Sequence, residues 1–503
     1  MDQPDRHDAA AHADVGVAAG DIADPPKNLW AAFRKIGPGI ILAGSIIGSG
    51  ELLLTTALGA KYGFVFLWLI LFSCVIKVFV QIELGRYSLS SGLPTLTALD
   101  ELPGPRLGAH WLVWWWFIML MITVFQLGAM VGGVGQAMNL AFPKVAERLA
   151  SGCESWGPQL AETIRDKPEH PWAVLTALAA VVLLLSGGYR RIERITTILV
   201  ASVTLVTVGC VAALPGMGYP VGLDDIREGF SLNILALPAV AIAAAFGTFG
   251  ITGVGAAELY AYPYWCLEKG YARFTGPRSP SPDWAARAHG WMRVMYLDAW
   301  FSMVVFTVAT VSFYILGATV LHRQGLYPEK SKMIETLSEM YVPTFGPWTK
   351  IVFLIGVWAV LFKTLYVASA SNSRLTADFL GLSHLVKYRD DGDRAKWIRR
   401  CCIFYPLLAL LLYLWWADPK AMVILGGFVQ AATLPIISGA TIYLRYRRTD
   451  PRLAPSRLSD ACLWFAFLTI TAVALYAIPH WVVNDLWPAV NTWFSPATSG
   501  ISS

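Results

Sequence analysis

A glutamate lies inside a hydrophobic stretch, directly after a group of small residues, in the segment GSIIGSGELLLTTALGAKYGF at 44–64. A carboxylate at the centre of a bilayer costs about 3 kcal/mol on insertion scales, and glycine weakens the interior of a helix. The run Gly48, Ser49, Gly50 and Glu51 therefore indicates a break in a helix beside a chemically active group. Unwound backbone exposes carbonyl oxygens to cations, and the nearby carboxylate can bind a cation or carry a proton.

A second stretch, FGTFGITGVGAAELYAYPYW at 246–265, repeats this combination. It contains Thr252 and Gly255 and reaches a lone acid, Glu258, although the glycine pair precedes the acid by three positions here and by one position in the first stretch. Two carboxylates that face one cavity could ligate a hard cation, so Glu51 and Glu258 are the candidate metal ligands.

Long hydrophobic runs must position these residues. The chain has 503 residues, of which 56% are hydrophobic and 15% charged. A membrane-spanning helix needs about 20 mostly apolar residues, and eleven such segments are centred near 49, 75, 125, 179, 204, 247, 305, 361, 408, 432 and 470. The sequence therefore predicts an all-α membrane protein with about eleven transmembrane helices.

The two glycine-rich stretches fall in spans 1 and 6. The second stretch lies five spans after the first, and an odd number of spans per repeat inverts the second copy relative to the first. Paired, interrupted spans at matching positions predict a 5+5 inverted repeat, with helices 1 and 6 broken where they meet near mid-membrane. The expected fold supports alternating access better than an open channel.

The same residues have a simpler interpretation. Glycines can be small-residue contacts between helices, and the two glutamates can form ion pairs with Lys77 or Lys363, the two lysines within spans.

Basic residues predict the orientation, because Lys and Arg favour cytoplasmic loops. With the N-terminus inside, 26 of the 39 Lys and Arg residues lie on the cytoplasmic side and 11 outside. The net charge of +5 thus reflects topology and does not indicate a nucleic-acid partner. We expect a disordered cytoplasmic tail at 1–28, a transporter domain at 29–485 and an external C-terminal tail at 486–503.

Other classes of site have no sequence signal. Cysteine and histidine show no metal-ligand spacing, and no nucleophile–base constellation suggests an enzyme. We expect no cofactor, and the expected partners are the lipid bilayer and a transported cation or small solute; the oligomeric state is not predicted.

The chain resembles the Nramp family over about residues 29 to 480. The resemblance rests on the order of LGAKYGF, ELGRYSLSSG, GGVGQAMNLAF, ELYAY and ATLPI. It implies the LeuT-type fold and divalent-metal transport.

The family's metal-site motif is replaced in this chain. Its span-1 motif Asp-Pro-Gly-Asn falls on residues 48–51, and its span-6 Met-Pro-His falls on 255–257, so the Asp, Met and His are absent. The span-3 acid is replaced near Met130 and the span-10 glutamine by Thr433. Span 8 packs against span 1 in this fold, where some relatives bind sodium, so Lys363 could replace that ion as a tethered cation.

Our first hypothesis is an Nramp-like secondary transporter of a divalent cation with a remodelled, oxygen-only site. Losing a thioether removes a feature that favours soft metals. The alternative is a proton- or ion-coupled transporter of a small organic solute on the same fold.

Overall fold

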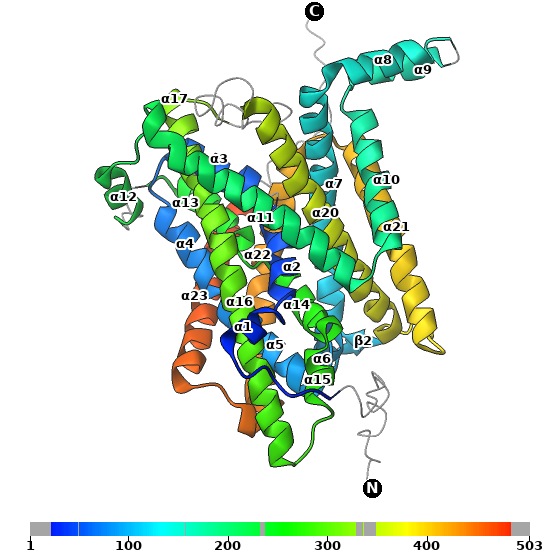
Figure 1. Cartoon of the computed structure of the whole chain (residues 1–503), viewed down its shortest axis with the longest axis vertical. Coiled ribbons are helices and arrows are strands. Elements are labelled where there is room, and N and C mark those ends of the chain that lie inside the picture. The colour runs from blue at the N-terminus through cyan, green and yellow to red at the C-terminus, as the bar shows by residue number, and fades with distance from the viewer. Residues whose placement is uncertain are drawn as a thin grey trace, which may run out of the picture.

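The chain folds into a bundle of long helices that run between two ends of the molecule (Figure 1). The computed structural model describes residues 22–48, 50–155, 157–231, 237–327, 335–336 and 349–483. Within these residues nine helices are long and apolar enough to cross a membrane, or up to eleven if each of two bent helix pairs is one span. The eleven spans predicted from the sequence correspond to these segments.

The spans are built from the following helices, in chain order: α2 (Pro38–Ile46), the π-helical segment η4 (Gly50–Thr55) and α3 (Thr56–Tyr62); α4 (Leu67–Ile76) and α5 (Val78–Ser91); α7 (Trp111–Ala141); α10 (His170–Ser186); α11 (Tyr189–Ala213); α13 (Ala239–Ile251) and α14 (Ala256–Lys269); α16 (Pro282–Leu316); α20 (Thr349–Leu382); α21 (Asp391–Trp415); α22 (Pro419–Arg447); and α23 (Arg457–Trp481).

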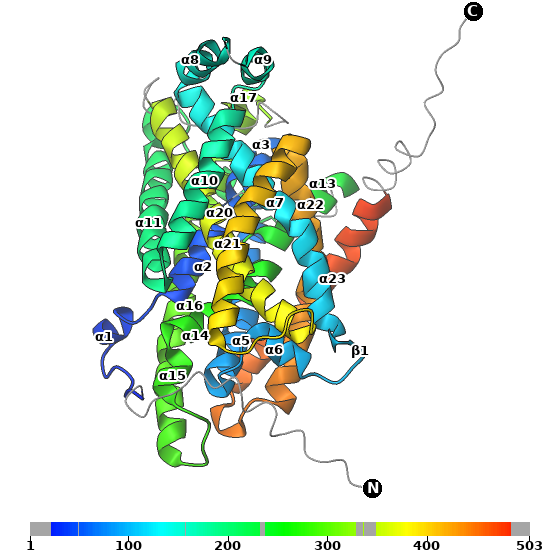
Figure 2. The ribbon, with the colours of Figure 1, turned by 90° about the vertical axis from the view of Figure 1, so that its right-hand side faces the viewer.

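Shorter elements connect them. These are α1 (Leu29–Phe33), α6 (Thr95–Asp100), the two-residue strands β1 (Arg106–Leu107) and β2 (Ala109–His110), α8 (Pro143–Cys153), α9 (Pro158–Asp166), η5 (Leu214–Met217), α12 (Leu223–Gly229), α15 (Tyr271–Thr275), η7 (Gly317–Leu321), α17 (His322–Gln324) and η9 (Pro451–Leu453). The helices α8 and α9 project from one end, and α15 lies at the other (Figures 1 and 2).

Helices 1 and 6 are both discontinuous, as the sequence predicted. In span 1, α2 ends at Ile46 and η4 begins at Gly50, with a bend of 44° between the two parts. In span 6, α13 ends at Ile251 and α14 begins at Ala256. The first span of each half is therefore interrupted.

Gly253 shows why the break in span 6 needs glycine. Its φ angle is +70°, a conformation that side chains with a Cβ rarely adopt. A Cβ there would also lie 2.9 Å from the Cα of Cys74 in α4. The glycine thus allows both the turn of the backbone and the close approach of α4.

The broken helices lie inside the bundle, where other spans cover them. The helix α2 packs against α11, α14, α16 and α20, and α13 packs against α22 and α23. The long helix α7 contacts α20, α21 and α22. Irregular backbone at membrane depth is tolerated only where protein or a wet cavity surrounds it, and this packing meets that condition.

A buried acid secures the start of α2. Asp298, in α16, accepts hydrogen bonds from the backbone N–H groups of Gly37 (2.8 Å) and Gly39 (2.6 Å). These N–H groups have no partner within the helix, and a carboxylate complements the positive end of the helix dipole.

The terminal segments predicted from the sequence fall largely outside the described residues. Of the predicted tail 1–28, residues 22–28 are described. Ala23 donates to the Phe274 carbonyl (3.0 Å) and accepts from Trp291 Nε1 (2.8 Å), so this part lies against α15 and α16. The predicted external tail at 486–503 lies outside the described residues.

Candidate functional site

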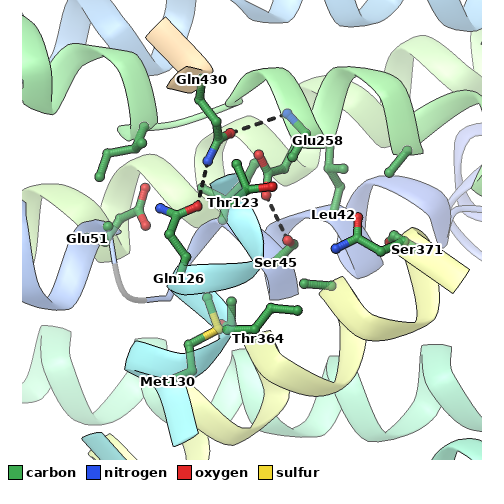
Figure 3. A pocket seen from close by; sticks show the side chains of 18 residues that line it. Leu42, Ser45, Glu51, Thr123, Gln126, Met130, Glu258, Thr364, Ser371 and Gln430 are labelled. Carbon is green, nitrogen blue, oxygen red and sulfur yellow. Dashed lines mark hydrogen bonds between the residues drawn. The ribbon is translucent and has the colours of Figure 1, made fainter. Parts of the chain in front are cut away.

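A cavity of about 60 Å³ lies where the two breaks meet. Side chains from α2, η4, α7, α13, α14, α20 and α22 line it (Figure 3). Its polar lining residues are Ser45, Glu51, Thr123, Gln126, Glu258, Thr364, Ser371, Asn372 and Gln430. Because a water occupies about 30 Å³ of liquid volume, the cavity has room for about two water molecules.

Glu51 connects the two breaks. Its side chain is 1% exposed, and Oε1 accepts a hydrogen bond from the N–H of Gly253 at 3.1 Å. The other oxygen, Oε2, accepts from the N–H of Gly48 at 3.4 Å. The carboxylate is therefore held by backbone donors from both interrupted helices while it borders the cavity.

Glu258 borders the same cavity from the first turn of α14. Its Oε1 accepts a hydrogen bond from the hydroxyl of Ser45 in α2 at 2.8 Å. A carboxylate is favoured in the first turn of a helix because the helix dipole is positive there. The structure thus brings together the two acids that the sequence selected.

Two glutamines complete the polar lining. Gln430 Oε1 accepts from the N–H of Ala257 at 3.3 Å, and Gln430 Nε2 donates to Gln126 Oε1 at 2.9 Å (Figure 3). This chain joins α7 and α22 to the start of α14. Sequence reasoning missed both glutamines, although an amide within an apolar span was a visible signal.

The other residues selected from the sequence occupy different places. Gly50 lines the cavity, and Gly48 and Gly255 adjoin the carboxylates of Glu51 and Glu258. Ser49 lies outside the described residues.

Two threonines selected from the sequence bond to other groups. The hydroxyl of Thr252 lies 3.3 Å from that of Thr55. Thr433 accepts from Trp115 Nε1 at 3.1 Å and donates to the carbonyl of Val429. Neither threonine is among the residues that line the cavity. Gln430, three residues before Thr433, provides the polar group of span 10 instead.

The two buried lysines bond to backbone carbonyls and not to the glutamates. Lys77 Nζ donates to the carbonyls of Phe249 (2.7 Å) and Thr252 (2.5 Å). Lys363 Nζ donates to the carbonyls of Gly44 (2.8 Å) and Ile47.

Among the ion pairs of the described residues, none joins either lysine to Glu51 or Glu258. The described residues therefore contain no direct ion pair of the kind that the alternative interpretation requires. The ammonium groups bind carbonyls at the ends of the interrupted helices, because these carbonyls lack hydrogen-bond partners within their own helices.

The ligands available to a metal are mainly oxygen atoms. Within the described part of the chain, no group of three or more His, Cys, Asp or Glu side chains could hold a metal ion. A cation in the cavity would meet two carboxylates, together with hydroxyl and carboxamide oxygens. One thioether, that of Met130 in α7, also lines the cavity, although the sequence suggested an oxygen-only site.

The bundle and its paired breaks have the LeuT-type fold. A manganese transporter of Eremococcus coleocola superposes with a TM-score of 0.65 at 15% identity, covering 95% of this chain and 92% of that one. Mhp1, a nucleobase-cation-symport-1 family transporter in a closed conformation with bromovinylhydantoin bound, gives a TM-score of 0.56 at 14% identity, covering 91% and 92% of the two chains. At these identities the comparison concerns the fold alone.

The family can be stated from the sequence match. The model of the natural resistance-associated macrophage protein-like family, Nramp, matches residues 39–479, and the chain belongs to this family. A relative from Listeria welshimeri, named divalent metal cation transporter MntH, is 24% identical over 366 residues, which cover 71% of this chain and 69% of the relative. The resemblance inferred from the sequence is thereby confirmed.

Proposed function

We propose that this protein is a secondary transporter that moves a divalent metal cation across the membrane through the cavity between the two breaks. The observation that carries the proposal is that Glu51 and Glu258, from opposite halves of the chain, border one polar cavity. Membership of the Nramp family and a relative named for divalent metal transport support the same substrate class.

The lining favours a hard cation that keeps part of its water shell. Mg²⁺ in particular retains several waters and binds through one or two carboxylates. Two carboxylates, neutral oxygen donors and room for about two waters, at about 30 Å³ each, suit such an ion. We propose Glu51 and Glu258 as the charged ligands, with Gln126 and Gln430 ordering the water shell or binding the ion directly.

The protein sits in the membrane with its N-terminus cytoplasmic and its C-terminus external in this proposal. The support is the excess of Lys and Arg in the loops on the N-terminal side. We also propose that its activity is transport and not catalysis, as the name of its relative from Listeria welshimeri implies for that protein.

A small organic solute is the second candidate substrate. The observation that favours it is the carboxamide lining, because Gln126, Asn372 and Gln430 offer donors as well as acceptors. A bare cation uses only acceptors, whereas an amino acid or a similar solute uses both.

Uptake into proteoliposomes distinguishes the two substrates. Purified protein is reconstituted and tested with Mg²⁺, Mn²⁺, Ca²⁺ and a panel of amino acids, with and without a pH gradient. We expect uptake of a divalent metal that is lost in Glu51→Gln and kept in Glu147→Gln, a matched change at an exposed residue of α8. Uptake of an amino acid without any divalent metal would replace the first candidate by the second.

A further inference from the structure

Two buried lysines repeat the same arrangement at the two breaks. Lys77 binds the carbonyls of Phe249 and Thr252, at the end of α13. Lys363 binds the carbonyls of Gly44 and Ile47, at the end of α2. In both cases the two carbonyls are three residues apart, and both lysine side chains are 0% exposed.

The carbonyls at these ends are an attractive site for positive charge. The last carbonyls of a helix have no partner within it, and the helix dipole makes this end negative. In water these groups would be solvated. Here they lie among packed helices, so a cation must come either from the protein or from solution.

Each site also contains a hydroxyl group from the helix that supplies the lysine. Ser73 donates to the carbonyls of Phe249 (3.1 Å) and Thr252 (2.9 Å). The hydroxyl of Thr364 lies 3.3 Å from the carbonyl oxygen of Gly44 and 2.9 Å from that of Val360 in its own helix. Without the ammonium group, each hydroxyl could rotate to present its oxygen, so each site would offer three oxygen atoms of the type that binds alkali cations.

Both lysines are also connected to the cavity through the backbone that they bind. Lys77 holds the carbonyl of Thr252, and the next residue, Gly253, donates its N–H to Glu51. Lys363 holds the carbonyl of Ile47, and the next residue, Gly48, donates its N–H to the same carboxylate. Both lysines therefore fix backbone donors that position Glu51.

We propose that Lys77 and Lys363 are built-in monovalent cations, each occupying an oxygen site that would otherwise bind an alkali ion. They are positioning residues that hold the two breaks around Glu51. It follows that transport needs no alkali cation, and that removing either ammonium group creates a site for one. The transport part of this inference rests on the proposed function.

The test compares Lys77→Ala and Lys363→Ala with the wild type in NaCl, LiCl, KCl and choline chloride. We expect wild-type uptake to be the same in all four salts. In choline, each variant should be slower by about 10- to 100-fold, the usual effect of losing a group that supports a ligand. An alkali ion of suitable size should restore much of that loss. Lys61→Ala, at an exposed lysine of α3, is the matched control and should behave as the wild type.

Thermal unfolding in the same salts gives a second readout that does not depend on transport. Ligand that binds only the folded state raises its stability, so an alkali ion should raise the Tm of each variant but not that of the wild type. This readout separates the two proposals, since it holds even if the protein moves no divalent metal.

Three results would overturn the proposal. The first is wild-type uptake that requires sodium or potassium. The second is a folded Lys77→Ala or Lys363→Ala variant whose Tm and uptake are the same in choline and in every alkali salt. If alanine prevents folding in all salts, Lys77→Gln and Lys363→Gln are measured instead, and no response to alkali ions in these variants would be the third.

Discussion

The side chain of Glu51 accepts a hydrogen bond from the backbone N–H of Gly253 at 3.1 Å, although the two residues lie in different halves of the chain. The same carboxylate accepts from Gly48 in its own span. Both interrupted helices thus donate to one buried acid. A movement of either helix would change the hydrogen bonds of the carboxylate that we propose as a metal ligand.

Removing the charge of Glu51 should stop transport without unfolding the protein. In Glu51→Gln the amide can still accept from Gly253, but it loses the charge that attracts a cation. We expect uptake to fall at least about tenfold, as for other changes to the coordination of a metal. The amide NH2 cannot accept from the N–H of Gly48, and losing this long hydrogen bond should cost about 1–3 kcal/mol, so Tm should fall by a few degrees. Wild-type uptake by this variant would exclude Glu51 from the site.

The glutamine pair provides a second test of the cavity. Gln430→Leu leaves the N–H of Ala257 and the side chain of Gln126 without their partner. An unpaired buried polar group costs about 1–3 kcal/mol. We therefore expect a lower Tm and slower uptake, measured in detergent and in proteoliposomes. Gln159→Leu, at an exposed residue of α9, is the control. Unchanged uptake in Gln430→Leu would mean that the pair only supports the helices.

The paired breaks could be predicted because their signals are local. Glycines followed by an acid within an apolar stretch are visible in a single window of sequence, and the same pattern recurs five spans later. The number of spans and the order of the halves followed from hydrophobic length. The sequence therefore predicts that Glu51 and Glu258 lie beside the breaks, and both side chains line the cavity between them.

The remaining side chains depend on helix depth and rotation, which a single sequence does not define. Gln126 and Gln430 meet across 304 positions of the chain, and the pair forms only if both helices have the right rotation. The sequence predicted Thr433 as the site residue of this span, but Thr433 lies three residues, or nearly one helical turn, beyond Gln430. The lysines illustrate a second limit of sequence-based prediction. Every residue has a backbone carbonyl, so the sequence does not show which carbonyls a lysine will bind, and it suggests only oppositely charged side chains as partners.

Metal selectivity should reflect the oxygen-rich lining. We expect Cd²⁺ to bind no more tightly than Mg²⁺ in calorimetry, because soft metals gain most from sulfur ligands. The one thioether of the cavity lining, Met130, allows a direct check. Tight Cd²⁺ binding that disappears in Met130→Leu would show that this sulfur ligates the metal, and tight binding that survives would place the metal elsewhere.

A network outside the membrane should make stability depend on pH. Hydrogen bonds from Arg452, with Arg278 nearby, hold the pKa of Asp450 well below its usual range. A carboxyl group whose pKa is lower in the folded state stabilises the fold at pH values above its unfolded pKa, which is about 3.9 for Asp. This stabilisation is lost as the pH falls from about 3.9 through the pKa of the folded state.

Asp450→Asn tests this link. We expect a lower Tm than the wild type at pH 7 and at pH 5, with a difference that narrows below about pH 4. Asp224→Asn changes an acid that is 96% exposed in α12 and should have little effect at any pH. A difference for Asp450→Asn that grows on acidification would contradict the assigned sign.

The last prediction concerns Glu51 and Lys363 together. In a structural ion pair, removing one partner leaves a buried charge, and removing both relieves the damage. The ammonium of Lys363 instead binds the carbonyls of Gly44 and Ile47, so Glu51→Gln with Lys363→Met should restore neither transport nor stability. We expect Glu51→Gln to lower uptake because the charge is lost, and Lys363→Met to lower it because the break loses its ammonium group. The uptake of the double variant should be no higher than that of the more impaired single variant. Uptake and Tm are measured for all four proteins in choline, where no alkali ion can replace the lysine. Recovery of both in the double variant would show that the two residues only neutralise each other, and Glu51 would then not be a substrate ligand.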